Sequence, residues 1–306
     1  MPVSRIAALG WENCAHLSTD HAELLVTLDV GPRILHFALT GGDNVLRAFA
    51  DQVGTSGEKE FVARGGHRLW VSPETERTYA PDNTSVEYEL RAPSSIHVAN
   101  RAVAPWHLRK EMIISLATDR AAVRIEHRIT NEGERPTEIA SWGLTVMQPG
   151  GIELIPQPPL GSHDAEFLPN RVIVPWTYTD FSDDRWRWGR RFIFLQPKAG
   201  RPATKIGLSH REGWVAYALP GVVFVKAFAY EEGAVYPDLG CNFETFSKDD
   251  FIELEALSPM KQLAPGEAIG HTERWQLFPI QGLSETNDEA ALARWLTPLI
   301  SNITFV

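Results

Sequence analysis

The stretch Tyr236-Pro-Asp-Leu-Gly-Cys-Asn-Phe-Glu-Thr-Phe246 is followed by Ser247-Lys-Asp-Asp250 and then by Phe251-Ile-Glu-Leu-Glu-Ala-Leu257. Two runs of alternating apolar and polar residues on either side of a short polar segment predict a β-hairpin with a four-residue turn. The hairpin is the strongest indication in the chain of an antiparallel, all-β fold.

The polar side chains of this hairpin are acidic on one face. With a four-residue turn, Glu244 lies opposite Glu253 and Asn242 lies opposite Glu255. Like charges directly opposite each other destabilise a strand pair, so this face needs a cation, a shared proton or a hydrogen-bonding ligand. The hairpin therefore predicts a carboxylate site, with an ordinary solvated acidic face as the alternative.

Short strand-like runs separated by Gly, Pro and Asn turns continue along most of the chain. They cover residues 24–30, 33–39, 86–90, 96–98, 108–116, 122–130, 138–147, 191–195, 205–209, 214–218, 222–230, 241–246, 251–257 and 271–278. One helix is predicted at about 285–298, capped by Asn287 and continuing toward Pro298. The pattern predicts a single all-β domain of sandwich type over residues 1–306, with a helical C-terminal segment.

Composition narrows the class of partner. The 306 residues are 43% hydrophobic and 22% charged, and the formal net charge of −10 argues against nucleic-acid or anionic-membrane partners. There are two cysteines, no apolar run of roughly 18 residues, and no apolar core for a secretory signal near the first residues. Scattered histidines and the lack of glycine-rich phosphate motifs predict no metal and no cofactor. We expect a cytoplasmic protein whose partner is a small neutral molecule such as a sugar.

A second group of chemically active residues lies in Ala63-Arg-Gly-Gly-His-Arg-Leu-Trp-Val-Ser-Pro-Glu74. Arg64 and Arg68 can donate several hydrogen bonds, and a histidine at position 67 can give or take a proton. The Gly-Gly pair allows a positive φ or a close approach of the backbone. The alternative interpretation is a bulged strand that enters a loop.

Aromatic and basic residues add to the candidate site. The chain has ten tryptophans, whose rings stack on sugar C–H faces, although most tryptophans in a large sandwich pack in its core. Lys226 shares a strand face with Phe224, Phe228 and Tyr230. It is expected either to neutralise the carboxylates or to extend to solvent.

Several short motifs carry a family resemblance. Cys241-Asn-Phe-Glu-Thr-Phe246 after Tyr236-Pro-Asp238 resembles the catalytic strand of aldose 1-epimerases in the galactose-mutarotase-like superfamily. Gly31-Pro-Arg-Ile-Leu-His36 is similar to the family's opening hairpin, and Arg64-Gly-Gly66 to the hexose-6-phosphate mutarotase branch. The turn Leu263-Ala-Pro-Gly-Glu267 before the last strand is also typical. Gly65–Trp70 together with Asn242–Phe246 most resembles an uncharacterised family within this superfamily.

The resemblance implies a β-supersandwich whose concave face binds a pyranose. In true epimerases a glutamate takes the proton of the anomeric hydroxyl and a histidine protonates the ring oxygen, so that the anomers interconvert. Glu244 matches that base. The histidine strand falls near 140–146, where Trp142 or a neighbour stands instead, and His67 is the candidate acid. The expected substrate contacts are Arg64, Arg68, Trp70, Glu74, Trp142, Lys226, Asn242 and Glu253.

Two other functions stay open from the sequence. One is a non-catalytic carbohydrate-binding protein on the same fold. The other is an acid-sugar lyase or isomerase, in which Arg64 or Arg68 holds a substrate carboxylate. The sugar, its phosphorylation and the oligomeric state also stay open. Because the carboxylate face of the hairpin needs compensating donors, we also predict that the segment Gly65–Arg68 lies within contact reach of Glu244 in one cleft.

Overall fold

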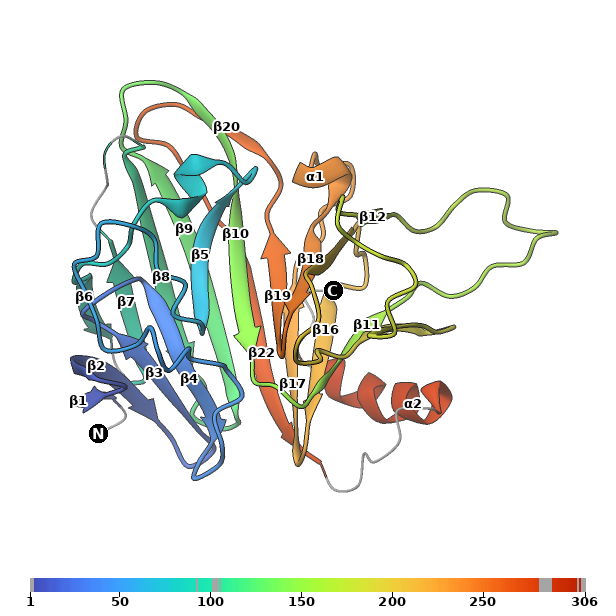
Figure 1. Ribbon diagram of the computed structural model, residues 1–306, viewed down its shortest axis with the longest axis horizontal. Helices are drawn as coiled ribbons and strands as arrows, with labels where there is room; N and C mark the ends of the chain where they lie inside the picture. Colours follow the sequence, from blue (N-terminus) through green and yellow to red (C-terminus); the bar gives the residue numbers. More distant parts are fainter. Residues whose placement is uncertain are drawn as a thin grey trace.

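The computed structural model describes residues 3–91, 93–100, 104, 106–280, 288–301 and 303. Two large antiparallel sheets lie against each other and form the predicted all-β sandwich (Figure 1). Their strands come from alternating parts of the chain, so each sheet depends on contacts between distant segments. Among the described residues, no helix has the length and apolar character required to cross a bilayer.

The first sheet runs in the order β1-β2-β3-β4-β5-β10-β19-β18-β15-β12, and β20 pairs with the end of β10. Its strands are β1 (Val3–Ala8), β2 (Trp11–Ser18), β3 (Ala22–Thr27), β4 (Arg33–Leu39), β5 (His67–Ser72), β10 (Thr137–Met147), β12 (Ile173–Pro175), β15 (Thr204–Leu208), β18 (Phe243–Lys248), β19 (Phe251–Leu257) and β20 (Lys261–Leu263).

The second sheet runs in the order β13-β14-β11-β16-β17-β22-β9-β8-β7-β6, and β21 pairs with β9. Its strands are β6 (Glu87–Arg91), β7 (Ser95–Ala99), β8 (Leu108–Leu116), β9 (Ala122–Asn131), β11 (Ile152–Pro156), β13 (Trp186–Trp188), β14 (Phe192–Leu195), β16 (Trp214–Leu219), β17 (Val222–Phe228), β21 (Ala268–Ile269) and β22 (Thr272–Pro279).

Helices are few in the described chain: the 3-10 turn η1 (Glu76–Tyr79), the four-residue α1 (Pro237–Gly240) and α2 (Glu289–Ile300). The predicted helix at 285–298 corresponds to α2, whose N-cap is Asp288; its carboxylate accepts from the backbone N–H groups of Ala290 and Ala291. The predicted cap Asn287 lies outside the described residues. Apolar side chains four residues apart on α2 pack on the outer face of the second sheet: Leu292, Leu296 and Ile300.

The decisive hairpin is present, but its register differs from the expectation by two residues. β18 continues to Lys248, so the turn is only Asp249–Asp250, with Asp249 at φ 51°. Glu244 therefore pairs with Glu255, and Glu253 pairs with Phe246. A shift of two preserves the face on which each side chain lies, so the acidic face survives the correction.

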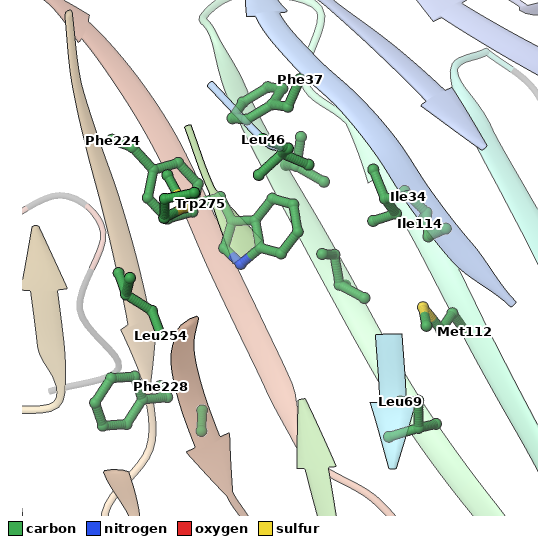
Figure 2. Packing of buried hydrophobic residues seen from close by; sticks show 14 of the residues in the cluster. Ile34, Phe37, Leu46, Leu69, Met112, Ile114, Phe224, Phe228, Leu254 and Trp275 are labelled. Carbon is green, nitrogen blue, oxygen red and sulfur yellow. The ribbon is translucent and has the colours of Figure 1, made fainter. Parts of the chain in front are cut away.

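The main core fills the space between the two sheets. Trp275 on β22 is fully buried, with Phe37 of the first sheet 6.0 Å away and Phe224 of its own sheet 5.5 Å away, measured between ring centroids (Figure 2). Leu69 from β5 and Ile114 from β8 belong to the same cluster. Side chains of the first sheet therefore fall into two sets: an inner set facing this core and an outer set facing away from the second sheet.

The Gly-Gly pair before β5 has a backbone role. Gly65 and Gly66 have φ of 78° and 67°, and a Cβ at these positions would lie 2.1 Å from the carbonyl oxygen of Arg47 and 2.2 Å from that of Ile34. Only glycine fits such a tight passage between neighbouring backbones. The pair brings the chain into the middle of the first sheet rather than against a ligand.

Candidate functional site

Strand alternation divides the predicted site residues between the two faces of the first sheet. On β5, Leu69 and Val71 belong to the inner core, whereas Trp70 packs with Trp142 and Leu257 in a separate cluster on the outer face. Six predicted residues gather on or beside this outer face: Arg68, Trp70, Glu74, Trp142, Glu244 and Glu253.

A lysine between two glutamates forms the centre of the outer face. Lys205 on β15 places its Nζ 2.7 Å from Glu244 Oε2 on β18 and 2.9 Å from Glu255 Oε2 on β19. All three side chains are almost completely buried, with at most 5% of each exposed. The like-charged pair predicted for the hairpin is therefore present, with Glu255 in the place expected for Glu253. The compensating cation is Lys205 rather than Lys226, Arg64 or Arg68.

Two indole rings flank the lysine. The Nζ of Lys205 lies 4.7 Å from the ring centroid of Trp142 and the same distance from that of Trp176. The Trp142 indole N–H also donates to Glu255 Oε2 at 3.0 Å. Because ammonium groups are attracted to aromatic faces and carboxylates accept the indole N–H, these contacts fix Lys205 and Glu255 in place.

Glu244 shares with Glu255 a second carboxylate oxygen, Oε1, that is buried and has no hydrogen-bond partner among the described residues, but of the two only Glu244 is among the residues that line a cavity. Glu244 lines a cavity of about 450 Å³ whose other walls are Pro73, Glu74, Thr75, Tyr79, Trp142, Trp176 and Asp238. Larger hollows exist elsewhere on the surface, but this one combines aromatic walls with a buried carboxylate. A buried acceptor left free at a cavity wall is available to a ligand.

The electrostatics of this group favour proton exchange. Burial raises the pKa of the Glu244 carboxyl well above its ordinary value of 4.5; Lys205 opposes this effect, while Glu255 and Asp238 add to it. Burial alone lowers the pKa of Lys205, but the carboxylates of Glu255 and Glu244 outweigh burial and raise it. Burial is therefore the largest cause of the raised pKa of the Glu244 carboxyl, and repulsion from Glu255 adds to it.

An ion pair extends the outer face beside this centre. Both terminal nitrogens of Arg68 donate to Glu253 Oε1 at 3.1 Å, and the guanidinium lies 4.2 Å from the ring centroid of Trp70. Trp70 in turn packs edge-on against Trp142 at 5.5 Å. Arg68 and Glu253 thus neutralise each other within the aromatic wall.

The inner face of the same sheet carries a second buried network. Lys226 on β17 lies 3.0 Å from Glu273 Oε1 and donates to Thr145 Oγ1 and to the carbonyl oxygens of Gly143 and Leu254. Gly143 leaves space for this network, because a Cβ there would lie 2.4 Å from Glu273 Oε1. Lys226 therefore neither neutralises the hairpin carboxylates nor extends to solvent; both expectations are wrong.

His67 belongs to this inner network. The Nδ1 of His127 lies 3.3 Å from the carbonyl oxygen of His271, which can only accept, so the His127 proton is assigned to Nδ1. His127 Nε2 then accepts from His67 Nε2 at 2.8 Å, and His67 Nδ1 accepts from Thr145 Oγ1 at 2.9 Å. Burial lowers the pKa of His67 to about 3. The predicted pairing of His67 with Glu244 in one cleft is wrong, because the two side chains point to opposite faces of the sheet.

By residue type, His67, His127 and Glu273 could hold a metal ion. The geometry favours hydrogen bonding instead. The two Nε2 atoms share a proton at 2.8 Å, and the Lys226 ammonium already compensates the Glu273 carboxylate. The Lys226 ammonium and the other hydrogen-bond donors oppose Glu273's burial and hold its carboxyl pKa well below 4.5. This charged group and its hydrogen-bond partners form a self-sufficient network.

Two further predicted contacts lie away from the cavity walls. Arg64, at φ 56°, is fully buried and donates to Glu58, to Asn83 and to the backbone of Thr55, so it holds together the loop before β5. Asn242 exchanges two hydrogen bonds with the backbone of His210. Both residues make structural contacts.

Sequence reasoning missed Lys205, the ion-pair partner of Glu244, and the wall residues Tyr79, Trp176 and Asp238, and it named Glu255 without including it among the site residues. Lys205 is the first residue of the predicted strand 205–209, so it interrupts no apolar run and gave no signal of a site. Trp176 and Asp238 come from irregular segments, where periodicity gives no information about direction.

Comparison with solved structures identifies the fold. No family model and no curated protein matches the chain. A TPR-domain containing protein from Parabacteroides distasonis matches with 12% identity and a TM-score of 0.60, over 89% of this chain and 48% of that one. The chain thus spans about half of that protein.

Two mutarotase-related structures are covered over their full length. A galactose mutarotase-like protein from Lactobacillus casei has 9% identity and a TM-score of 0.57, over 87% of this chain and 100% of that one. A galactose mutarotase related enzyme from Lactobacillus acidophilus has 11% identity and a TM-score of 0.50, over 88% and 100%. At such low identity the similarity establishes architecture alone, and the chain has a galactose-mutarotase-like fold.

Proposed function

We propose that the outer face of the first sheet binds a pyranose, and that Glu244 moves a proton at the anomeric hydroxyl, as in aldose 1-epimerases. The observation that carries the proposal is the buried Glu244 carboxyl, whose Oε1 is unpartnered at the wall of an aromatic-lined cavity. A volume of about 450 Å³ is within the range of small-molecule sites.

The chemistry follows from the surroundings of Glu244. A carboxyl whose pKa is raised by burial exchanges protons closer to neutral pH than an exposed one. Lys205 holds the other oxygen, so Oε1 is the atom left to meet a sugar hydroxyl. Trp142 and Trp176 offer apolar surfaces on which the C–H face of a ring can stack.

A non-catalytic carbohydrate-binding protein is the second candidate. It is favoured by the Lys205–Glu244 contact, because a neighbouring ammonium group stabilises Glu244 as a carboxylate, a charged acceptor of hydrogen bonds from a sugar. It is also favoured by the cavity walls, which contain no histidine among the described residues to protonate the ring oxygen. The acid-sugar function has less support, because Arg64 and Arg68 are both engaged with glutamates.

The test begins with a panel of monosaccharides and short oligosaccharides in a thermal-shift assay. A ligand at 100 times its dissociation constant stabilises the folded state by about 2.7 kcal/mol. For each sugar that binds, anomeric exchange is followed by polarimetry or NMR. Under the enzymatic proposal, Glu244→Gln keeps binding and slows exchange about 10²- to 10⁴-fold, the usual contribution of a general base.

Glu12→Gln is the matched control, because Glu12 is exposed on β2, near the opposite edge of the sheet. It should bind and exchange like wild type. Binding without any accelerated exchange in wild type would reject the epimerase and leave the binding protein. No binding by any sugar in the panel would reject both.

A further inference from the structure

Three of the eight residues that line the outer-face cavity carry carboxylates. Glu74 and Asp238 line it together with Glu244, and Glu255 lies directly behind Glu244 across the hairpin. The Glu74 carboxylate accepts from Tyr79, and Asp238 Oδ2 accepts from Ser72 at 3.4 Å. Neither forms an ion pair with any described residue, so no described cation compensates either carboxylate at the cavity.

The cations near the cavity are already committed. Lys205 is shared by Glu244 and Glu255, and it is covered by the rings of Trp142 and Trp176. Arg68 gives both terminal nitrogens to Glu253. A phosphate or carboxylate on a ligand would meet Glu74 and Asp238, and among the described residues that line the cavity there is no cation to receive it; like-charge contacts of this kind cost binding energy.

The acidic walls would not by themselves make a site. The independent observation is Glu244 Oε1, which is buried, lacks a partner and lies on the same cavity wall. A ligand that satisfies Oε1 with a hydroxyl brings its other substituents toward the rim. There Glu74 is exposed and Asp238 is half-buried.

We propose that this cavity selects a pyranose bearing an ammonium group, an amino sugar, over the matching neutral sugar, and excludes phosphorylated and acidic sugars. This inference rests on the proposed function. The ammonium faces Glu74 and Asp238 at the rim, and a ring hydroxyl meets Glu244 Oε1. Selectivity thus comes from the two rim carboxylates, while the ring itself is held by the aromatic walls.

The experiment measures dissociation constants by isothermal titration calorimetry for matched sets of sugars at pH 6, where the amine is protonated. Each set contains a hexose, the corresponding hexosamine, its N-acetyl derivative, the 6-phosphate and the uronic acid, in the gluco, galacto and manno series. The N-acetyl derivative carries nitrogen at the same ring position without the positive charge, so it distinguishes an effect of charge from an effect of the substituent. One partly exposed ion pair predicts about fivefold tighter binding of the hexosamine than of the hexose.

Variants of the two rim carboxylates test whether they cause the preference for the hexosamine. Glu74→Gln and Asp238→Asn should each reduce the hexosamine-to-hexose ratio, and together they should bring it to about one. Asp119→Asn, in the exposed turn between β8 and β9 of the second sheet, makes the same change of charge and should leave the ratio as in wild type. Thermal unfolding of each variant checks that the fold is intact.

The outcomes are separable. Hexosamine preference that disappears in the double variant supports the inference. Equal binding of hexose and hexosamine, tighter binding of the phosphate or uronic acid, or a preference unchanged in the double variant overturns it and leaves the proposed sugar site standing. If no member of any set binds, the sugar site itself is rejected.

Discussion

The two faces of the first sheet compensate their buried carboxylates in different ways. Each buries a lysine beside a glutamate: Lys226 with Glu273 on the inner face, and Lys205 with Glu244 and Glu255 on the outer face. On the inner face, both Glu273 oxygens have partners: Lys226 and His271 at Oε1, and the Trp275 indole at Oε2. On the outer face, Oε1 of Glu244 and Oε1 of Glu255 both lack a hydrogen-bond partner among the described residues.

This difference distinguishes buried groups that stabilise the fold from buried groups that are available to a ligand. A fully satisfied buried network stabilises one arrangement of the core, whereas a buried acceptor without a partner costs free energy unless a ligand completes it. By this criterion the histidines of the inner face are structural, although histidine is the residue type most often sought in a catalytic site. Glu153 in the core and Glu255 also have a buried Oε1 without a partner among the described residues, and Glu244 is the functional candidate because it alone of the three lines the outer-face cavity.

The largest effect is expected at Lys226. Lys226→Met leaves the Glu273 carboxylate buried without its cation, and breaking a buried pair in this way costs about 3–5 kcal/mol of unfolding free energy. Urea unfolding at pH 7.5 measures it.

Lys248→Met is the matched control, since Lys248 is exposed at the end of β18, and it should change stability little. Adding Glu273→Leu to Lys226→Met should recover part of the loss, because the unpaired charge is then removed. A loss below 1 kcal/mol in Lys226→Met would show that the inner pair is not the stabilising network described above.

The next effect is a loss of stability in acid caused by the inner histidines. The folded pKa of His67 is about 3 and that of His127 is also lowered, in both cases chiefly by burial, whereas an unfolded histidine titrates near 6.5. The unfolded state therefore binds more protons as the pH falls below 6.5, and stability is lost in that direction. Between pH 7.5 and 5.5 the two histidines together should cost about 2–3 kcal/mol.

Urea unfolding at the two pH values measures the slope of unfolding free energy against pH. His127→Gln should make it shallower by about half of that difference. His163→Gln is the control, because this side chain is fully exposed and should leave the slope unchanged. A slope in His127→Gln equal to that of wild type would assign the acid sensitivity to other groups.

Much of this comparison could be read from strand alternation. The acidic face of the hairpin was predicted because Glu253 and Glu255 are two residues apart on one strand and Glu244 faces them across the turn, and a register error of two residues leaves all three on the same face. The same rule places Lys226 between Phe224 and Phe228, both core residues, and His67 on the side of Leu69 and Val71. Applied to these two residues, parity would have assigned them to the inner face.

The rest depends on contacts between distant segments. Lys205 reaches Glu244 because β15 pairs with β18, and the register puts Gly207 opposite Glu244. No local pattern specifies which strand lies beside β18, since strand order in a sandwich is set by the packing of the whole chain. The cavity wall residue Trp176 follows β12 outside any strand, and Asp238 lies in the four-residue α1 with a left-handed φ of 50° that its sequence neighbourhood does not predict.

The smallest effect is expected on the outer face, with the opposite sign to that of Lys226. Glu244→Gln removes a buried carboxyl and its repulsion with Glu255, while Lys205 keeps Glu255 as its partner. Unfolding free energy should therefore stay unchanged or rise by about 1 kcal/mol, as for other residues that serve function at the expense of stability.

The pH dependence sharpens this prediction. Because the folded pKa of Glu244 is raised, its carboxyl retains a proton that the unfolded chain loses above about 4.5. This contribution to wild-type stability is fully present below that pH and declines as the pH rises toward the folded pKa. A glutamine side chain does not titrate, so its stability lacks this pH dependence. The increase in unfolding free energy of Glu244→Gln over wild type should therefore grow from pH 5 to pH 8. Urea unfolding at both values measures it, with Glu12→Gln as the control on an exposed strand position. A gain that shrinks with rising pH would mean that Glu244 is held as a carboxylate by Lys205, and the outer face would then resemble the inner one.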